Sequence, residues 1–234
     1  MFFEEAMILQ GTFANIVAVV VGCLVGRWAG CYLPDRMRQT LMVGVGLAVL
    51  LIGLQLALQS KQVMIVIGGL IIGGLIGEGI GIEKRLEAFG ERLQHRFSGM
   101  GKISEGFVTA SLLYCAGAMS IMGSLQEGLG DKPTILYAKA ALDGIASIIL
   151  TSTLGIGVIF SVIPLLLYQG GITLAAGFAR SVLTESVVAE MNAVGGLLIV
   201  AIAIDLLGIK RFPVGNLLPS MFVVAALLWI LGMA

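Results

Sequence analysis

The clearest chemistry in the sequence belongs to Lys139 and Asp143, two opposite charges four positions apart within a long apolar stretch. At that spacing the two side chains share one face of a helix and can pair. Asp143 lies about ten residues beyond Pro133, where we expect a membrane span to begin, so its carboxylate falls near the costly bilayer midplane. Two interpretations remain open. The pair holds its helix in a bundle, or Asp143 belongs to a proton or cation path with Lys139 as its partner.

Other polar side chains occupy apolar segments on both sides of this pair. An ionisable residue inside a membrane span normally faces the bundle interior, pairs, or lines an aqueous path. A hydroxyl taken singly more often bonds to a carbonyl of its own helix, so these residues are candidates as a group. The candidate substrate or ion path comprises Asp143, Lys139, Ser120, Ser124, Gln126, Glu127, Gln169, Glu190 and Asn15.

Glycines interrupt the apolar chain between residues 155 and 171. A break in a membrane helix frees backbone groups that lipid cannot satisfy, so the freed groups must be buried in protein or line a watery cavity. Pro164 alone is interpreted as a kink satisfied by neighbouring helices. The helix breaks expected to help form a site are at Gly155, Gly157, Gly170 and Gly171.

Motifs for enzymatic catalysis are absent from the sequence, including HExxH, GxSxG and the Walker A pattern. The three cysteines have no CxxC spacing and there is one histidine, so neither a metal site nor a disulfide framework is expected. Asp143 and Asp205 lie in different apolar segments without a shared motif, which argues against a paired-aspartate protease. We therefore expect no enzyme, no catalytic residues and no cofactor.

The composition points to the elements that must position these residues. Hydrophobic residues make up 58% of the chain and charged residues 12%, and 33 of the 234 residues are glycine. Charges cluster in short stretches between long apolar runs, which excludes a soluble fold of this size. A net charge of zero and the lack of a long basic tract exclude a nucleic-acid partner. We expect an all-α, polytopic transmembrane bundle in a lipid bilayer, forming one integral membrane domain over residues 1–234.

The number of spans follows from the length needed to cross the hydrocarbon, about 20 residues. Residues 133–180 have the length for two spans, although their division is uncertain. Seven crossings with one re-entrant segment is the alternative to the eight that we count. Outside that region the expected spans are 11–33, 40–59, 62–82, 106–127, 187–208 and 214–233.

Lysine and arginine residues indicate the orientation. Ten of them fall in alternate loops, whereas Lys61, Lys132 and Arg180 fall on the opposite side, so both termini are expected outside the cytoplasm. Residues 83–104 are expected to connect two halves of the protein as a cytoplasmic amphipathic segment. Its apolar positions recur at steps of three and four, which fits a helix on the membrane surface or a solvated connector.

Two ladders of small residues predict close helix packing. Such faces let helix backbones approach one another in lipid, either within the chain or in a homo-oligomer. One ladder consists of Gly69, Gly73, Gly77 and Gly81, and the other of Ala14, Ala18, Gly22, Gly26 and Gly30.

A weak internal similarity aligns residues 46–56 with residues 196–206 at a constant offset of 150. By the charge pattern the two segments cross the membrane in opposite directions. Inverted repeats of this kind are a common architecture of secondary transporters.

Several segments also resemble a known family. They are GFVTASLLYCAGAM at 106–119, GSLQ at 123–126, LDG at 142–144, TLGIG at 153–157, LYQG at 167–170, AVLLIG at 48–53 and GIE at 81–83. Together they resemble the YqgA/YdfK-like family of bacterial membrane proteins, domain of unknown function 554, over nearly the whole chain. The resemblance implies a bacterial cytoplasmic-membrane location and a polytopic helical fold, and it supplies no substrate or catalytic residue.

The sequence therefore predicts an inner-membrane transporter or channel for a small polar solute or ion. The alternative is a membrane scaffold or regulatory subunit that transports nothing and uses its polar residues for packing.

Overall fold

The computed structural model describes residues 9–30, 34–96, 103–115, 118–179 and 184–233. These residues form helices and no strand, which confirms the all-α prediction. Six candidate spans are long and apolar enough to cross a membrane. They correspond to α2 (Gln10–Gly30), α3 (Asp35–Ala57), α4 (Val63–Ile80), α8 (Thr134–Leu154), α9 (Val162–Ala179) with the preceding 3-10 helix η1 (Ile156–Ser161), and α10 (Glu185–Leu206).

The remaining apolar helices are broken or short. A bend of 61° separates α6 (Ile103–Cys115) from α7 (Ala118–Gly128), and the two count together as a seventh candidate span. The segment predicted as the eighth crossing contains α11 (Val214–Leu217) and α12 (Ser220–Ile230), which together fall short of the length of the other spans.

The chain divides into two compact units. The first unit consists of Met1–Met42, Phe89–Cys115 and Met119–Arg180, and the second of Val43–Ala88, Ala116–Ala118 and Ser181–Ala234. The first unit therefore contains α2, α6, α8 and α9, and the second contains α4, α10, α11 and α12.

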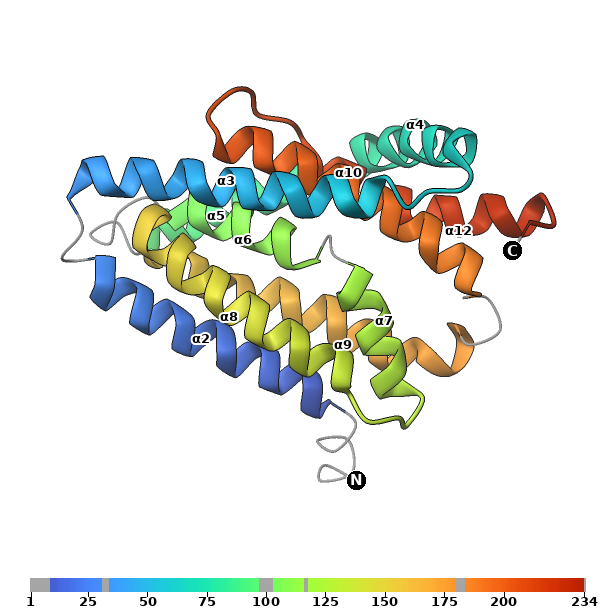
Figure 1. The fold of residues 1–234 in the computed structure, drawn as a ribbon, viewed down its shortest axis with the longest axis horizontal. Coiled ribbons are helices and arrows are strands. Elements are labelled where there is room, and N and C mark those ends of the chain that lie inside the picture. The colour runs from blue at the N-terminus through green and yellow to red at the C-terminus, as the bar shows by residue number, and fades with distance from the viewer. Residues whose placement is uncertain (1–8, 31–33, 97–102, 116–117, 180–183, 234) are drawn as a thin grey trace. The chain divides into compact units, whose positions relative to one another are not determined.

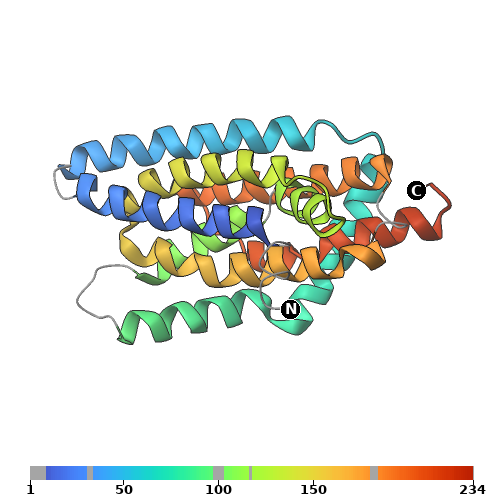
Figure 2. The ribbon, with the colours of Figure 1, turned by 90° about the horizontal axis from the view of Figure 1, so that it is seen from below.

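In the first unit, the glycine ladder of α2 packs against α8. A Cβ added at Gly22 would meet the backbone oxygen of Gly144, and one added at Gly26 would meet the backbone of Ile148. The two helices lie side by side along their lengths in both views (Figure 1, Figure 2). The predicted close packing of this ladder is confirmed, and its partner lies within the same chain.

In the second unit, the other ladder packs against the last helices. Side chains added at Gly69 and Gly73 would meet Val224 and Ser220 of α12, and one added at Gly77 would meet the backbone of Asn216 in α11. Gly69, Gly73 and Gly77 therefore pack within the chain, whereas Gly81 ends α4 with a φ of 71° and has nothing within 4 Å of its Cβ position.

Helix directions bear on the number of crossings. On α2, Gly11 meets Leu136 and Gly30 meets Ser152, so α2 and α8 run in the same direction. An odd number of crossings must separate two such spans. Counting α3, α4 and the α6–α7 pair gives that odd number, so the directions favour the bent pair as a full crossing rather than a re-entrant segment.

The region around residues 155–171 contains one break and not two. Gly155 ends α8 with a φ of 91°, and a Cβ at Gly157 would meet the backbone of Ile103 in α6. The break expected at Gly170 and Gly171 is wrong, because α9 continues through both. Without water to compete for its backbone groups, a membrane helix tolerates interior glycines. Pro164 falls in the first turn of α9, where a missing N–H is tolerated.

The predicted connector contains α5 (Ile82–Arg96), while residues 97–102 lie outside the described part. Its apolar face contacts protein. Phe89 packs against Phe107 of the first unit with ring centroids 5.4 Å apart, and Leu86 lies beside Gly215 of the second unit. At least part of this face is therefore not available to lipid.

The start of α5 is joined to α11 by a buried carboxylate. Glu83 is 6% exposed, and its Oε2 accepts a hydrogen bond from the Gly215 N–H at 2.7 Å. In return, the Glu83 N–H donates to Asn216 Oδ1 at 2.8 Å. Asn216 Nδ2 also donates to Glu78 Oε2 at 2.6 Å. Asn216 thus ties the end of α4 to the start of α5.

This carboxylate gives a prediction for the dependence of stability on pH. Burial raises the pKa of Glu83 above its ordinary value of 4.5, although the hydrogen bond from Gly215 opposes the rise. The folded protein therefore binds this proton more tightly than the unfolded chain does. The contribution of Glu83 to stability is fully present below pH 4.5 and is lost as the pH rises through the pKa that Glu83 has in the folded protein.

We expect the unfolding midpoint of Glu83→Gln to fall less than that of the unmodified protein between about pH 4 and about pH 8. Glutamine keeps an acceptor for the Gly215 N–H and removes the titration. Thermal unfolding of the two proteins across this range is the measurement. If the unfolding midpoints of the two proteins changed equally with pH, Glu83 would not contribute to the pH dependence of stability.

Candidate functional site

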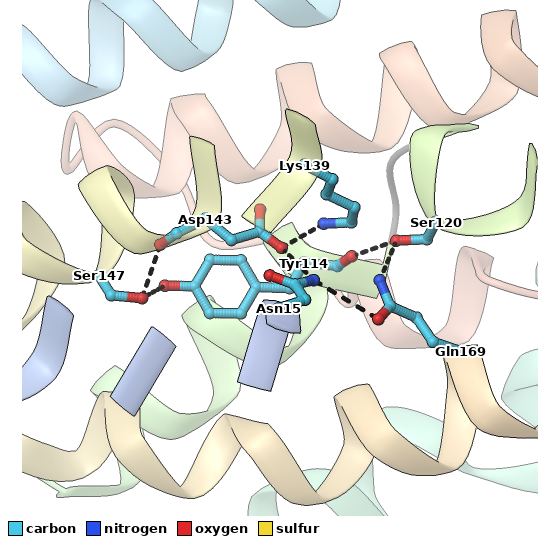
Figure 3. A network of polar contacts seen from close by, with 7 residues as sticks. All are labelled: Asn15, Tyr114, Ser120, Lys139, Asp143, Ser147 and Gln169. Atoms are coloured by element: carbon cyan, nitrogen blue, oxygen red, sulfur yellow. Dashed lines mark hydrogen bonds and ion pairs between the residues drawn. The ribbon is translucent and has the colours of Figure 1, made fainter. Parts of the chain in front are cut away.

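The predicted pair lies inside the first unit, where the close approach of α2 brings polar side chains onto α8. Lys139 Nζ and Asp143 Oδ2 form an ion pair, and the two residues are 4% and 8% exposed. Asn15 of α2 donates from Nδ2 to the same Asp143 oxygen at 2.9 Å (Figure 3). The carboxylate is therefore held by one cation and one amide, with no exposed partner among these contacts.

On one side of the pair the network continues toward α9 and α7. Asn15 Nδ2 lies 3.5 Å from Gln169 Oε1, and Gln169 Nε2 lies 3.5 Å from Ser120 Oγ. Ser120 Oγ donates to the backbone oxygen of Tyr114 at 2.7 Å. Each of these side chains points toward the next (Figure 3). Four predicted residues from four helices are thus in one cluster with Lys139.

On the other side of the pair, two residues that the sequence did not single out complete the cluster. Ser147 Oγ donates to the backbone oxygen of Asp143, and Tyr114 Oη lies 2.7 Å from Ser147 Oγ. Lys139 Nζ lies 5.8 Å from the centroid of the Tyr114 ring, within the range of a cation–π contact. Ser147 could have been found by its spacing of four from Asp143, whereas nothing local places Tyr114 here.

A second buried carboxylate lies on α7. Glu127, 4% exposed, accepts hydrogen bonds from the Gly11 N–H, from Thr12 Oγ1 at 3.1 Å and from Thr173 Oγ1 at 3.5 Å. Gly11 and Thr12 belong to the first turn of α2, so this carboxylate caps the positive end of that helix. Glu127 is thus held by hydroxyls and a backbone amide, in contrast to the ion-paired Asp143.

One polar atom of the cluster and one beside it have no partner among the residues that the structure describes. They are Asn15 Oδ1 and Ser124 Oγ, both buried, in residues that are 0% exposed. Leaving such an atom unpaired costs free energy, so a buried orphan normally signals a strained, wet or ligand-binding site. The cluster can therefore accept one further donor beside Asp143.

Two predicted path residues lie elsewhere. Gln126 Oε1 accepts from Thr134 Oγ1 and from the Ile135 N–H, each at 3.3 Å, at the start of α8. Glu190 belongs to the second unit, where it accepts from Ser60 Oγ at 2.6 Å and from the N–H groups that precede α4. The structure thus places both at helix starts and brings neither into the cluster around Asp143.

The described residues contain no group of three or more histidine, cysteine, aspartate or glutamate side chains that could hold a metal ion. What the cluster offers is a neutralised carboxylate, two amides, hydroxyls and a phenol. Such groups can bind a small polar species or hand a proton along hydrogen bonds.

Long apolar helices around a buried polar network define a polytopic helical membrane protein. The chain belongs to the family described as a protein of unknown function (DUF554), whose model matches residues 10–229. It is 34% identical over 225 residues to the uncharacterized membrane protein YdfK of Bacillus subtilis, covering 94% of this chain and 96% of that protein.

A second relative comes from another organism. The chain is 34% identical over 217 residues to the uncharacterized protein YqgA of Escherichia coli, covering 90% of this chain and 92% of that protein. No solved structure matches. The family expected from the sequence is confirmed.

Proposed function

We propose that the protein carries a small polar solute or ion across the cytoplasmic membrane of a bacterium, with both termini outside the cytoplasm. The observation that carries this proposal is the buried Lys139–Asp143 pair with the unpartnered Asn15 Oδ1 beside it. The polar cluster of the first unit is the binding site. Its members are Asn15, Tyr114, Ser120, Lys139, Asp143, Ser147 and Gln169.

The energetics of a buried ion pair support a function beyond packing. Taking both charges out of water costs several kcal/mol per ion, and well-packed apolar residues often stabilise a protein as well or better. A purely structural cluster would also have no reason to keep Asn15 Oδ1 unpaired. A polar ligand that donates to this oxygen removes the penalty when it binds.

The helix boundaries support the inverted repeat as part of the same proposal. α3 begins at Asp35 and α10 at Glu185, which are 150 residues apart, and α4 and α12 end at Ile80 and Ile230 with the same separation. The offset that aligns residues 46–56 with residues 196–206 therefore extends to the next helix.

Within the second unit, each helix runs antiparallel to its counterpart in the repeat: α3 to α10, and α4 to the segment of α11 and α12. On α3, Gly46 lies against Leu207, and Gly53, further along, lies against Gly196 and Val200. On α4, Gly69 meets Val224 and Gly77 meets Asn216. Antiparallel helices that pack against their own repeat partners fit the inverted-topology repeats of secondary transporters.

The alternative function, a membrane scaffold or regulatory subunit, requires the cluster to be dry in every state. Water access at a buried residue separates the two functions. Ser124 is suited to this test because its hydroxyl is fully buried and unbonded, so replacement by cysteine breaks no hydrogen bond.

We expect Ser124→Cys, in a variant lacking the three native cysteines, to react with a small water-soluble thiol reagent in proteoliposomes. A transporter exposes its site to water in at least one state. The control is Ser161→Cys, since Ser161 is equally buried but its hydroxyl donates to the backbone oxygen of Val158 in its own 3-10 helix. Equal lack of reaction at both positions would favour the scaffold.

A further inference from the structure

We propose that the ion moved by this protein is the proton, and that it travels along a track of buried polar side chains from Glu127 to Asp143 and on toward Ser147. This inference rests on the proposed function and specifies its ion. It is carried by the geometry of three helix faces and by the two unpartnered buried atoms.

The two carboxylates share the same three supporting helices. On α2, Thr12 contacts Glu127 and Asn15 contacts Asp143. On α9, Thr173 contacts Glu127 while Gln169 contacts Asn15. Thr12 and Asn15 are three residues apart and Gln169 and Thr173 four, so each pair lies on one helix face.

The third helix supplies the link between the two ends. On α7, Ser120 contacts Gln169 and Glu127 contacts Thr173, and Ser124 lies between them on the same face. Ser124 Oγ is buried and unbonded, like Asn15 Oδ1 on the facing helix. Ser124 is four residues beyond Ser120 and three before Glu127, so it lies on the stretch of α7 that joins the two ends, where an intervening water would pass a proton.

Beyond Asp143 the track continues along α8. Lys139, Asp143, Ser147 and Thr151 recur every four residues and are all buried. From the first to the last of them the helix rises about 18 Å, against about 30 Å for the hydrocarbon core. With the Glu127 end added, polar side chains cover most of the depth of a membrane.

The consecutive contacts favour the proton over a larger species. From Asp143 to Ser120, by way of Asn15 and Gln169, successive side chains are 2.9–3.5 Å apart. At the other end, Glu127 lies 3.1 Å from Thr12 and 3.5 Å from Thr173. A proton can move along such a chain by exchange between hydrogen-bonded oxygens and waters. A larger solute would need these contacts to separate.

The proposed step at Asp143 is a simple proton addition and release. A proton arriving from the Glu127 side bonds to an oxygen of the Asp143 carboxylate, which becomes a neutral acid. Lys139 keeps its own proton throughout and loses its counter-charge. The hydroxyl or water that donates this proton loses the O–H bond that Asp143 gains. Release of the new proton to a water on the Ser147 side breaks that bond again, forms an O–H bond on the water and restores the ion pair.

The surroundings of Asp143 contain few other titratable groups. Lys139 lies on its own helix, and Glu127 is the acidic group across the track. On the elements packed around α8, the remaining titratable side chains that face this region are Cys23 of α2, Tyr114 and Cys115 of α6, and Tyr168 of α9.

The test measures proton flux in proteoliposomes that contain a trapped pH-sensitive dye and are energised by a potassium gradient with valinomycin. We expect protein-dependent acidification. Asp143→Asn should slow it by about a hundredfold, the size of effect typical for a lost proton-transfer group. Glu127→Gln, which keeps acceptors for its partners, should also slow it. Ser161→Ala, a buried serine off the track, should leave the rate unchanged.

Asp143→Asn leaves Lys139 without its counter-charge, so the double variant with Lys139→Met is measured beside it as a neutral pair. Wild-type flux in the folded double variant would overturn the inference. So would the absence of protein-dependent flux in the unmodified protein. If Ser124→Cys is still labelled from water in that case, the proposed transport function survives and only the proton assignment fails. If neither labelling nor flux is seen, both fail.

Discussion

Lys139→Met lowers the free energy of unfolding by about 3–5 kcal/mol, because it leaves the Asp143 carboxylate buried without its cation. Among the described residues, Asn15 then remains to hold the carboxylate of an aspartate that is 8% exposed. Adding Asp143→Asn to this variant should recover most of the loss, since the orphaned charge is then removed. The measurement is denaturation of the purified protein in mixed micelles for both single variants and the double variant.

Lys84→Met is the matched control for this cycle. Lys84 also pairs with an acidic residue, Glu78, at 3.9 Å, but the two side chains are 79% and 59% exposed. Exposed pairs contribute little to stability, so little change is expected. A double variant as unstable as the sum of its single variants would mean that Lys139 and Asp143 are not energetically coupled.

The local parts of the site could be predicted from the sequence, and the nonlocal parts could not. The spacing of four between Lys139 and Asp143 is enough to predict their ion pair. The contact of Asp143 with Asn15 joins residues 128 positions apart, and that between Tyr114 and Ser147 joins residues 33 apart. Which face of α2 or α6 meets α8 depends on packing along the whole helix.

Glu190 shows why polarity alone misleads. It is as buried as the residues of the cluster, at 1% exposed, yet it serves a different physical need. Its carboxylate accepts from the N–H groups of Lys61 and Gln62, which directly precede α4, and thereby fixes the chain at the entry to that helix. Burial in an apolar segment therefore does not by itself assign a residue to the polar cluster, and its hydrogen-bond partners decide the assignment.

The glycines likewise include predictions that were confirmed and one that was wrong. A spacing of four correctly identified the faces through which α2 and α4 pack, because a helix face of small residues lets another helix backbone approach closely in lipid. Gly170 and Gly171 were expected to break a helix, yet α9 is continuous there. The break instead occurs at Gly155, where a positive φ requires glycine.

Gly77→Ala and Gly79→Ala should have opposite effects on stability, although they change the same residue type two positions apart on α4. A Cβ at Gly77 would lie 2.6 Å from the backbone carbon of Asn216 and 2.9 Å from its Cα. One at Gly79 would meet nothing within 4 Å. We expect a loss of about 1–3 kcal/mol for Gly77→Ala from overpacking, and a gain of about 0.5–1 kcal/mol for Gly79→Ala from the better helix former.

The loss at Gly77 should extend to the contacts of Asn216. Pushing α11 away from α4 stretches the hydrogen bonds that Asn216 makes with the Glu83 N–H and with Glu78. The pH dependence assigned to Glu83 should therefore weaken in Gly77→Ala and persist in Gly79→Ala. Denaturation of both variants at low and neutral pH measures this. Equal stability of the two variants would mean that the backbones of α4 and α11 are not in close contact at Gly77.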